Sequence, residues 1–342
     1  MQWLIEPPEK PDVGADLRLA EGPSSDSHVR DDGERPTATS DGLATPVDFK
    51  ARHGAGSERA LVLGGGGIFF IAWQVGYLNG LRQRGVDLTN AELVVGTSAG
   101  ALVASIVTAG KLASFSREVG VLAKLAGVLV PGATRRPSQE RALNLFSDAA
   151  DADPDTVRSI GFAALAAQGE SAAKFRRTVA LALGPGSAKW PAPALRIVTV
   201  DAYTGERLVV TGDAGVSAAR AAAASASVPG LFEPQPVLDR RCMDGGVSGS
   251  GTHGDIVAGA SRAVVLALGA SAPQGKARMT LPAGSFPREM QALADAGTEV
   301  LVRGPLAVDP ATLMSPKSVP EALVMADEQA DDDAAPTGEF WR

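Results

Sequence analysis

Short apolar runs alternate along this chain with longer segments whose apolar residues recur at helical spacing. The runs 60–63 and 93–95 are predicted strands, and the segments 71–84 and 101–108 that follow them are predicted helices. Strands and helices in alternation are typical of parallel strands joined by crossover helices. The pattern therefore predicts an α/β fold, with three α/β/α layers and a mostly parallel central sheet.

The rest of the chain continues this alternation after a long helical insertion. No strand pattern interrupts the helical periodicity from Leu112 to about Leu183, so these helices are expected to cover a sheet face or to form one wall of a pocket. Further strands are predicted at 195–201, 207–210, 237–243, 263–268 and 298–302, and further helices at 216–225, 287–296 and 319–328. A turn separates the first two of these strands, which predicts a hairpin.

Both ends of the chain differ in composition from its middle. Residues 1–56 are rich in Pro, Gly, Ser and Asp without a sustained apolar period, so they are expected to form a disordered acidic leader. Residues 57–330 are expected to fold as one α/β domain. Three consecutive aspartates at 331–333 begin an expected acidic C-terminal tail, 331–342, with frayed structure.

Gly96-Thr97-Ser98-Ala99-Gly100 lies between the predicted strand 93–95 and the predicted helix 101–108. A serine between two glycines at such a junction is the context of a nucleophile elbow, a tight turn that exposes the serine. The helix N-terminus behind Ser98 would offer N–H groups and a positive dipole end to a developing anion. A turn in which Ser98 only caps the helix fits the same residues. The stretch alone leaves both interpretations open.

Two further glycine-rich stretches follow predicted strands. Gly64-Gly65-Gly66-Gly67 could present N–H groups to a tetrahedral oxyanion or to a phosphate, or could form a plain turn. Its spacing matches neither the dinucleotide fingerprint nor a P-loop, and the bulky Ile68-Phe69-Phe70 suits an acyl chain better. Asp244-Gly245-Gly246 ends the predicted strand 237–243, so Asp244 is either a general base or part of a turn.

Composition narrows the chemistry that these motifs can perform. The net charge of −7 does not favour a nucleic-acid partner, and a single cysteine excludes intrachain disulfides and cysteine-based zinc sites. No cofactor or metal is predicted. Because His28 and His53 lie in the expected leader, His253 is the candidate for a Ser-His-Asp triad. The alternative is that Asp244 acts directly on Ser98, since partial burial raises the pKa of a carboxyl and strengthens it as a base.

The three motifs, in this order, resemble those of the patatin-like phospholipases, which hydrolyse acyl esters of lipids with a Ser–Asp dyad. Gly64–Gly67 is similar to that family's oxyanion loop, Gly96–Gly100 to its elbow, and Asp244–Gly246 to its D-G-G/A motif. The segment Ala224–Pro234 is similar to the Ala/Ser-rich stretch before the family's aspartate. The resemblance covers about residues 59 to 269.

The resemblance implies a patatin-like serine acyl hydrolase that needs no cofactor and cleaves phospholipid, lysophospholipid or acylglycerol esters through an acyl-enzyme. It implies Ser98 as the nucleophile, Asp244 as the base, Gly65, Gly66 and Gly67 as oxyanion donors, and Gly96, Gly100, Gly245 and Gly246 as supports of the two motifs. Two departures point to a divergent bacterial branch. Phe69 and Phe70 stand where the family usually has a basic residue and a glycine, and Val247 stands where an Asn-Pro commonly begins. These departures leave the substrate open.

Two other functions fit parts of the pattern. A catalytically weak protein that binds a lipid or acyl group as a regulatory module fits the altered oxyanion loop, and a covalent serine probe would distinguish it. A nucleotide-binding α/β protein could use the run 64–67, although the glycine spacing disfavours it. The apolar segment 119–130 is expected to be a buried helix rather than a membrane-docking one. Without a secretory signal or a membrane-length apolar run, a cytoplasmic protein is expected, with peripheral membrane contact and oligomeric state left open.

Overall fold

The computed structural model describes residues 45–46, 54–119, 135–149, 152–268, 285–306 and 308–342. The chain divides into two units, Met1–Arg35 and Pro36–Arg342, and all the described residues belong to the second. Most of the expected leader therefore lies outside the described residues. Thr45–Pro46, within that leader, forms a short strand. The domain boundaries read from composition stay a prediction.

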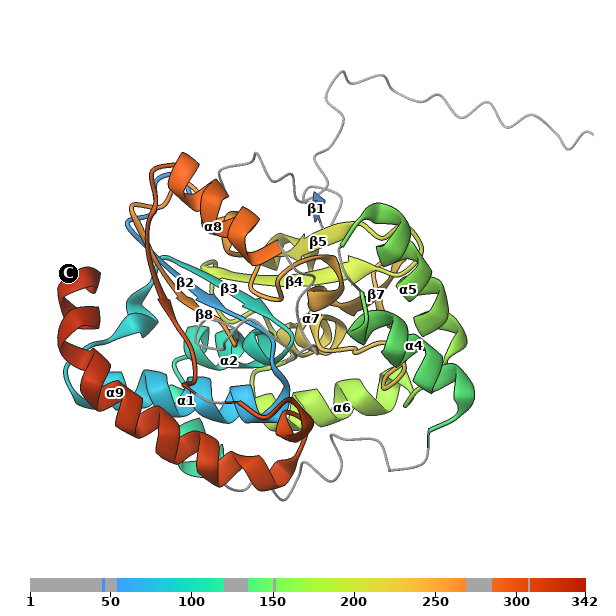
Figure 1. Ribbon diagram of the computed structural model, residues 1–342, viewed down its shortest axis with the longest axis horizontal. Helices are drawn as coiled ribbons and strands as arrows, with labels where there is room; N and C mark the ends of the chain where they lie inside the picture. Colours follow the sequence, from blue (N-terminus) through green and yellow to red (C-terminus); the bar gives the residue numbers. More distant parts are fainter. Residues whose placement is uncertain (1–44, 47–53, 120–134, 150–151, 269–284, 307) are drawn as a thin grey trace, which may run out of the picture. The chain divides into compact units, whose positions relative to one another are not determined.

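One mixed sheet of nine strands runs through the described part of this unit (Figure 1). The strands are β1 (Thr45–Pro46), β2 (Arg59–Leu63), β3 (Leu93–Thr97), β4 (Leu195–Asp201), β5 (Arg207–Val210), β6 (Gln235–Val237), β7 (Arg240–Asp244), β8 (Arg262–Leu266) and β9 (Glu299–Arg303). Their order is β1-β5-β4-β3-β2-β8-β9, and β7 pairs with both β4 and β6. The neighbours β4, β3, β2, β8 and β9 are parallel, whereas β5 and β7 join β4 antiparallel. The predicted parallel sheet and the predicted hairpin of β4 and β5 are confirmed.

The sheet is covered by helices on both faces. Along β2, Leu61 and Leu63 pack in the core that includes α1 and α9, whereas Ala60 and Val62 pack in the core that includes α8. The helices are α1 (Gly67–Gln83), α2 (Ala99–Thr108), α4 (Pro137–Ser147), α5 (Pro154–Ala166), α6 (Ala172–Leu183), α7 (Ala218–Ser225), α8 (Ser285–Asp295) and α9 (Val319–Trp341). Figure 1 shows α1 and α9 on one side of the strands and α8 on the other. The three-layer α/β/α prediction is confirmed.

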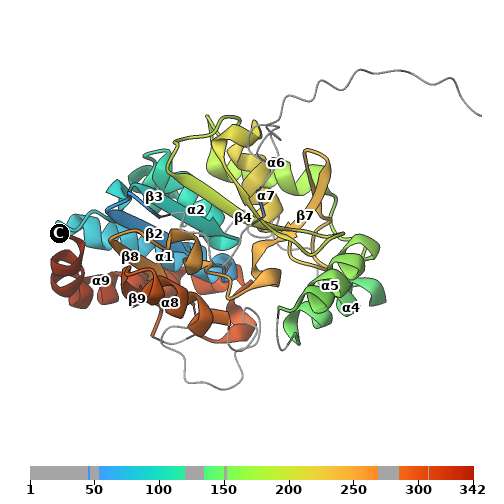
Figure 2. The same ribbon diagram turned by 90° about the horizontal axis from the view of Figure 1, so that it is seen from above.

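The predicted helical insertion is present between β3 and β4. Residues 112–119 and the helices α4, α5 and α6 are helical, and most of the segment 119–130 lies outside the described residues. Figure 1 and Figure 2 show α4 and α5 beside β7, where Ile160 and Met243 share a small apolar core. None of the helices within the described ranges is long and apolar enough to cross a membrane.

Two predicted elements are wrong in extent. The single strand expected at 237–243 is a hairpin of β6 and β7, because Leu238 turns the chain with a positive φ of 54°. An apolar residue at this turn conceals the break from the hydrophobic pattern. The expected frayed tail is part of α9, which continues to Trp341. The tail is ordered because its aspartates find partners: Asp333 accepts a hydrogen bond from the Tyr77 hydroxyl at 2.8 Å and pairs with Arg303 at 3.2 Å.

Candidate active site

Ser98 stands on a strained turn between β3 and α2. Its backbone has φ 52° and ψ −116°, a conformation that a residue with a side chain rarely adopts and that is typical of functional sites. A Cβ added to Gly100 would lie 1.9 Å from the Leu63 carbonyl oxygen, so only glycine allows α2 to begin this close to β2. Ser98 makes no side-chain capping bond to its helix. The structure therefore favours the elbow over the helix cap.

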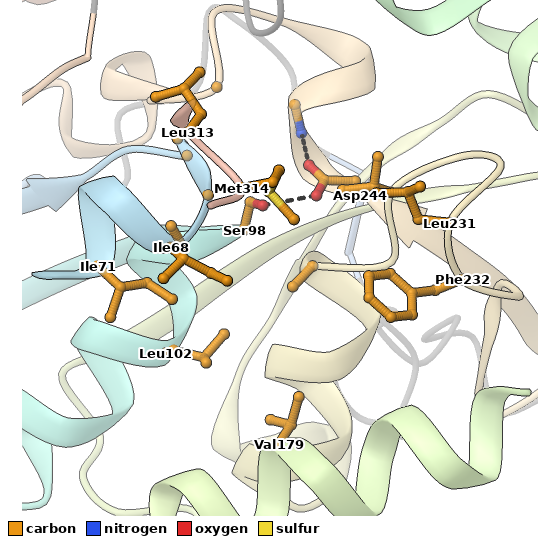
Figure 3. A pocket seen from close by; sticks show the side chains of 18 of the residues that line it. Ile68, Ile71, Ser98, Leu102, Val179, Leu231, Phe232, Asp244, Leu313 and Met314 are labelled. Atoms are coloured by element: carbon orange, nitrogen blue, oxygen red, sulfur yellow. Dashed lines mark hydrogen bonds between the residues drawn. The ribbon is translucent and has the colours of Figure 1, made fainter. Parts of the chain in front are cut away.

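Asp244, the last residue of β7, faces Ser98 across the pocket mouth (Figure 3). The Ser98 Oγ donates a hydrogen bond of 2.7 Å to Asp244 Oδ2, and the Gly246 N–H donates one of 2.8 Å to Oδ1. The Asp244 side chain is buried, and this burial raises its pKa to about 6 against the two hydrogen bonds, which lower it. The carboxyl is thus a stronger base than an aspartate in water.

Three residues of the pocket lining near Ser98 have backbone N–H groups that no described residue uses. Gly66, Gly67 and Ala99 line the pocket, and none of their N–H groups donates to another of the described residues. The N–H of Gly65 donates to the Gly251 carbonyl at 2.8 Å. Of the three expected oxyanion donors, Gly65 is therefore corrected because its N–H is already used, whereas Gly66 and Gly67 stay candidates. Ala99, the residue after the elbow serine, is a further candidate donor: the sequence pointed to the N–H groups of this helix N-terminus but did not name Ala99.

A further residue fixes the backbone of Ser98 by a hydrogen bond. Ser225, at the end of α7, accepts a hydrogen bond of 2.8 Å from the Ser98 N–H and donates one of 2.5 Å to the Val198 carbonyl of β4. The Ser98 N–H is therefore unavailable to a substrate. In the sequence, Ser225 lies in the Ala/Ser-rich stretch that the resemblance picked out, but nothing there assigned it a contact.

An apolar pocket opens beside Ser98. Its lining residues are Gly65, Gly66, Gly67, Ile68, Ile71, Ser98, Ala99, Leu102, Phe146, Phe175, Val179, Ala226, Val228, Leu231, Phe232, Asp244, Gly246, Gly251, Leu313 and Met314. Among these described residues, Ser98 and Asp244 have the only polar side chains. Figure 3 shows Ile71, Leu102 and Val179 on the side of Ser98 opposite to Leu313. Such a lining suits an apolar ligand, and the Ser98 hydroxyl and the Asp244 carboxyl are the polar groups that it would meet.

The segment after the four glycines behaves differently from its prediction. The helix α1 begins at Gly67 rather than near residue 71, and within Ile68-Phe69-Phe70 only Ile68 lines the pocket. Phe70 is buried and stacks on Trp73 with ring centroids 5.5 Å apart. The Phe69 N–H donates to the Leu313 carbonyl at 3.0 Å, which brings the chain between β9 and α9 against the glycine loop.

His253 does not contact the Ser98–Asp244 pair. Both of its ring nitrogens are used elsewhere, by Arg207 at 2.9 Å and by the Gly245 carbonyl at 2.8 Å. The triad that the sequence left open is therefore not formed. His253, Asp255 and Glu289 bring possible metal-ligand atoms within 4.8 Å of one another. The Arg207 guanidinium already provides the positive charge there, since it bonds Asp255 through two nitrogens at 2.9 and 2.6 Å.

Comparison with known proteins agrees with these motifs. A family model described as patatin-like phospholipase matches residues 61–252, which is more than half of the chain. This chain belongs to the patatin-like phospholipase family. The resemblance read from the sequence is thus confirmed, and the matched range includes Ser98 and Asp244. Leu313 and Met314 line the pocket from outside that range.

Two solved structures to which this chain is similar are distant from it in sequence. The crystal structure of VipD from Legionella pneumophila is 15% identical, has a TM-score of 0.36, and is matched over 79% of this chain and 67% of that one. The type III effector protein ExoU is 18% identical, with a TM-score of 0.31, over 79% of this chain and 53% of that one. This patatin-like chain therefore spans about half of the length of ExoU. No curated protein matches it.

Proposed function

We propose that this patatin-like protein is a serine acyl hydrolase that cleaves carboxylic esters of lipids through an acyl-enzyme on Ser98. The observation that carries the proposal is the 2.7 Å hydrogen bond from the Ser98 hydroxyl to a buried carboxylate, Asp244, at an apolar pocket. A hydroxyl is a weak nucleophile unless a base takes its proton during attack. Asp244, with its pKa raised to about 6, is ionised at neutral pH and is the base in reach.

The proposed reaction has two halves. Ser98 Oγ forms a bond to the substrate carbonyl carbon while its proton passes to Asp244 Oδ2, and the carbonyl oxygen becomes an oxyanion. The N–H groups of Gly66, Gly67 and Ala99 are the donors proposed to stabilise that charge. The carbon–oxygen bond to the alcohol breaks, and Asp244 returns the proton to the leaving oxygen. In the second half, water attacks the acyl-enzyme, Asp244 takes its proton, and Ser98 recovers its hydrogen as the acid leaves.

The pocket lining supports an acyl chain as the part of the substrate that enters. Burying one methylene group of such a chain contributes about 0.8 kcal/mol, so a chain of several carbons binds without any polar contact. Membership of the family implies a lipid substrate, and phospholipid, lysophospholipid and acylglycerol esters all carry the required group. Peripheral contact with a lipid surface, from which such a molecule would enter, belongs to the same proposal.

Replacing the nucleophile tests the proposal directly. We expect Ser98→Ala and Asp244→Asn each to lower kcat on a p-nitrophenyl acyl ester by about 10⁴-fold or more, because each removes a member of a unit that acts together. Ser105→Ala is the matched control: Ser105 is a buried serine of α2 that donates to the Ala101 carbonyl and does not line the pocket. Retained turnover in purified Ser98→Ala would contradict the proposal.

A fluorophosphonate probe distinguishes the enzyme from the lipid-binding alternative. Covalent labelling of wild-type protein that Ser98→Ala abolishes is expected for the hydrolase. If wild-type protein binds fatty acyl ligands but neither labels nor turns over, the protein is a binding module and the proposed reaction is wrong. A screen across lipid classes and chain lengths, with the Ser98→Ala control, then identifies the substrate.

A further inference from the structure

One loop contacts both halves of the candidate site. The Gly251 carbonyl accepts the N–H of Gly65 at 2.8 Å, beside the glycine loop. Two residues later, the His253 Nε2 lies 2.8 Å from the carbonyl oxygen of Gly245, which directly follows Asp244. The loop 249–254 therefore connects the chain that carries the proposed oxyanion donors with the chain that carries the proposed base.

The state of the His253 ring follows from its partners. The Arg207 guanidinium can only donate hydrogen bonds, so the Nδ1 that lies 2.9 Å from it accepts. The proton of the neutral ring is then on Nε2, which donates to the Gly245 carbonyl. Burial, assisted by the positive charge of Arg207 and opposed by Asp255, lowers the pKa of His253 to about 3. The ring is thus a neutral, fixed donor at neutral pH.

The loop itself is held by a buried carboxylate from α8. Glu289 accepts hydrogen bonds from the Ser250 N–H at 3.0 Å, from the hydroxyls of Ser250 and Thr252 at 2.6 Å each, and from the Gly254 N–H at 2.9 Å. Glu289 is fully buried. Four bonds to one side chain fix the loop on either side of residue 253, and they fix where the imidazole points.

We propose that His253 is a positioning residue: its ring holds the Gly245 carbonyl, and thereby keeps the Gly246 N–H on Asp244 Oδ1 and leaves Oδ2 directed at Ser98. This inference rests on the proposed function, because it concerns the proposed base. The Gly245 carbonyl also accepts a longer bond of 3.4 Å from the Ser248 hydroxyl within the same turn, and the shorter bond of 2.8 Å from His253 restrains this turn from outside. The carboxylate then has one oxygen occupied and one oxygen free for the serine.

Losing this restraint has a measurable consequence for acid–base chemistry. The Gly246 N–H lowers the pKa of Asp244, the Ser98 hydroxyl does the same, and burial opposes both. None of these three influences on the pKa of Asp244 comes from a charged side chain. The charged residues Arg207, Asp255 and Glu289 lie around His253 instead. If the Gly245–Gly246 peptide turns away, the pKa of Asp244 rises above about 6. The acid limb of the activity profile then moves to higher pH.

Two amide variants separate positioning from mere packing. In His253→Asn, the side-chain carbonyl can replace Nδ1 toward Arg207, but the amide is too short to reach Gly245. In His253→Gln, the longer amide can donate to the Gly245 carbonyl as Nε2 does. His253 has a positive φ of 54°, which Asn tolerates better than Gln. If His253 only stabilises the fold, the Asn variant should therefore be the more active of the two. If His253 positions the Gly245 carbonyl, the Gln variant should be the more active.

The experiment measures kcat, KM and the pH profile of p-nitrophenyl ester hydrolysis for wild-type, His253→Asn and His253→Gln proteins, with the folded fraction from circular dichroism. For His253→Asn we expect kcat per folded molecule to fall ~100-fold, with KM within ~2-fold, because a small misplacement of a catalytic group costs about that much. We also expect its acid limb to shift upward. His253→Gln is expected to restore most of kcat and the wild-type limb.

The control is Thr298→Val, which removes the hydroxyl that accepts the nearby Gly259 N–H at 2.9 Å without contacting the loop 249–254. It is expected to lower stability and leave the acid limb in place. If His253→Asn keeps wild-type kcat and pH profile, or if Gln is worse than Asn, the positioning role is wrong while the proposed function stands. A wild-type protein without Ser98-dependent hydrolysis would instead overturn the proposed function, and this inference with it.

Discussion

At the scale of single residues, the candidate site places a carboxyl group where its charge is costly. Asp244 is fully enclosed, and its two hydrogen bonds do not offset the loss of water, since its pKa remains raised to about 6. The raised pKa suits a general base at neutral pH. The same burial destabilises the folded protein whenever the carboxylate is ionised, so the proposed activity and the stability of the fold depend oppositely on this group.

Asp244→Asn is therefore expected to raise stability at pH 8 while it removes activity. The folded pKa of about 6 lies above the unfolded value of 3.8, so the stability that the protonated acid gives below pH 3.8 is lost as the pH rises through 6. The full loss is ~3 kcal/mol, at about 1.4 kcal/mol for each pKa unit. Denaturant unfolding of both proteins at pH 4 and pH 8 checks this. A variant less stable than wild type at pH 8 would contradict it.

The sequence could predict the chemical pair but not the groups that hold it. Ser98 and Asp244 were predicted because each follows an apolar strand in a glycine context, and because the three glycine-containing motifs in this order resemble one family. Gly65 was assigned wrongly because its N–H is used by Gly251, a contact between distant segments. Ala99, Ser225 and His253 are assigned their proposed roles through backbone N–H groups or long-range hydrogen bonds, which carry no periodic signal in a single sequence.

At the scale of elements, α6 lines the part of the pocket that lies away from Ser98. This helix belongs to the insertion between β3 and β4, and its Val179 is buried and lines the pocket. Figure 3 shows Val179 away from Ser98, beyond Leu102. Beside it, Phe175 stacks on Phe232 with ring centroids 3.7 Å apart, which closes the same side. The insertion thus contributes one wall of the pocket, which is one of the two roles that its helical pattern allowed.

Val179→Phe is expected to shorten the preferred acyl chain, because the larger ring fills the end of the pocket that the terminal carbons would occupy. Each excluded methylene is worth ~1 kcal/mol of binding, so kcat/KM for chains longer than the new optimum falls by ~10-fold or more. The measurement is kcat/KM across a p-nitrophenyl ester series. Leu181→Phe is the control on the same helix, since Leu181 is 67% exposed. An unchanged chain-length profile in Val179→Phe would show that the chain does not reach α6.

The presence of a helix or a strand was predictable where one hydrophobic period dominates the segment. The residues at which these elements begin and end were not predictable. The strands β2, β3 and β4 follow from apolar runs between helical segments. The break between β6 and β7 was missed because Leu238 at the turn is apolar, so the run looks continuous. The early start of α1 was missed because the helix begins at the last of four consecutive glycines, and nothing local distinguishes the last glycine of a loop from the first residue of a helix.

At the scale of the whole described domain, the C-terminal helix is part of the site's support. Figure 1 shows α9 running along α1, the helix that begins at the glycine loop. A Cβ on Gly76 or Gly80 of α1 would approach the Cβ atoms of Ala326 and Ala330 within 2.9 Å and 2.8 Å, so small residues on both helices allow this packing. The Trp73 indole N–H donates to Gln329 at 2.9 Å across the same interface. The α9 helix thus holds α1, and the chain that leads into α9 lines the pocket.

The last turn of α9 provides the sharpest test of this arrangement. Trp341 is 4% exposed, and its indole N–H lies 3.0 Å from the Asp87 carbonyl and 2.9 Å from Asn90 Oδ1. Trp341→Ala is expected to cost ~3 kcal/mol of unfolding free energy through lost burial, and Trp341→Phe, which keeps most of the ring and loses the N–H, ~1 kcal/mol. Denaturant unfolding measures both.

The two variants also test whether the end of the chain matters to the chemistry. Trp341 lies at the end of α1 that is remote from Ser98, so folded Trp341→Ala protein is expected to keep wild-type kcat at low temperature and to lose activity early on heating. That combination would show that the last turn of α9 stabilises the fold and takes no part in the chemistry. Glu339, an exposed neighbour on the same turn, gives the control Glu339→Ala, which is expected to change neither quantity because surface substitutions stay within about 0.5 kcal/mol. If Trp341→Ala unfolds no more easily than Glu339→Ala, the last turn is a frayed tail after all, as composition alone suggested.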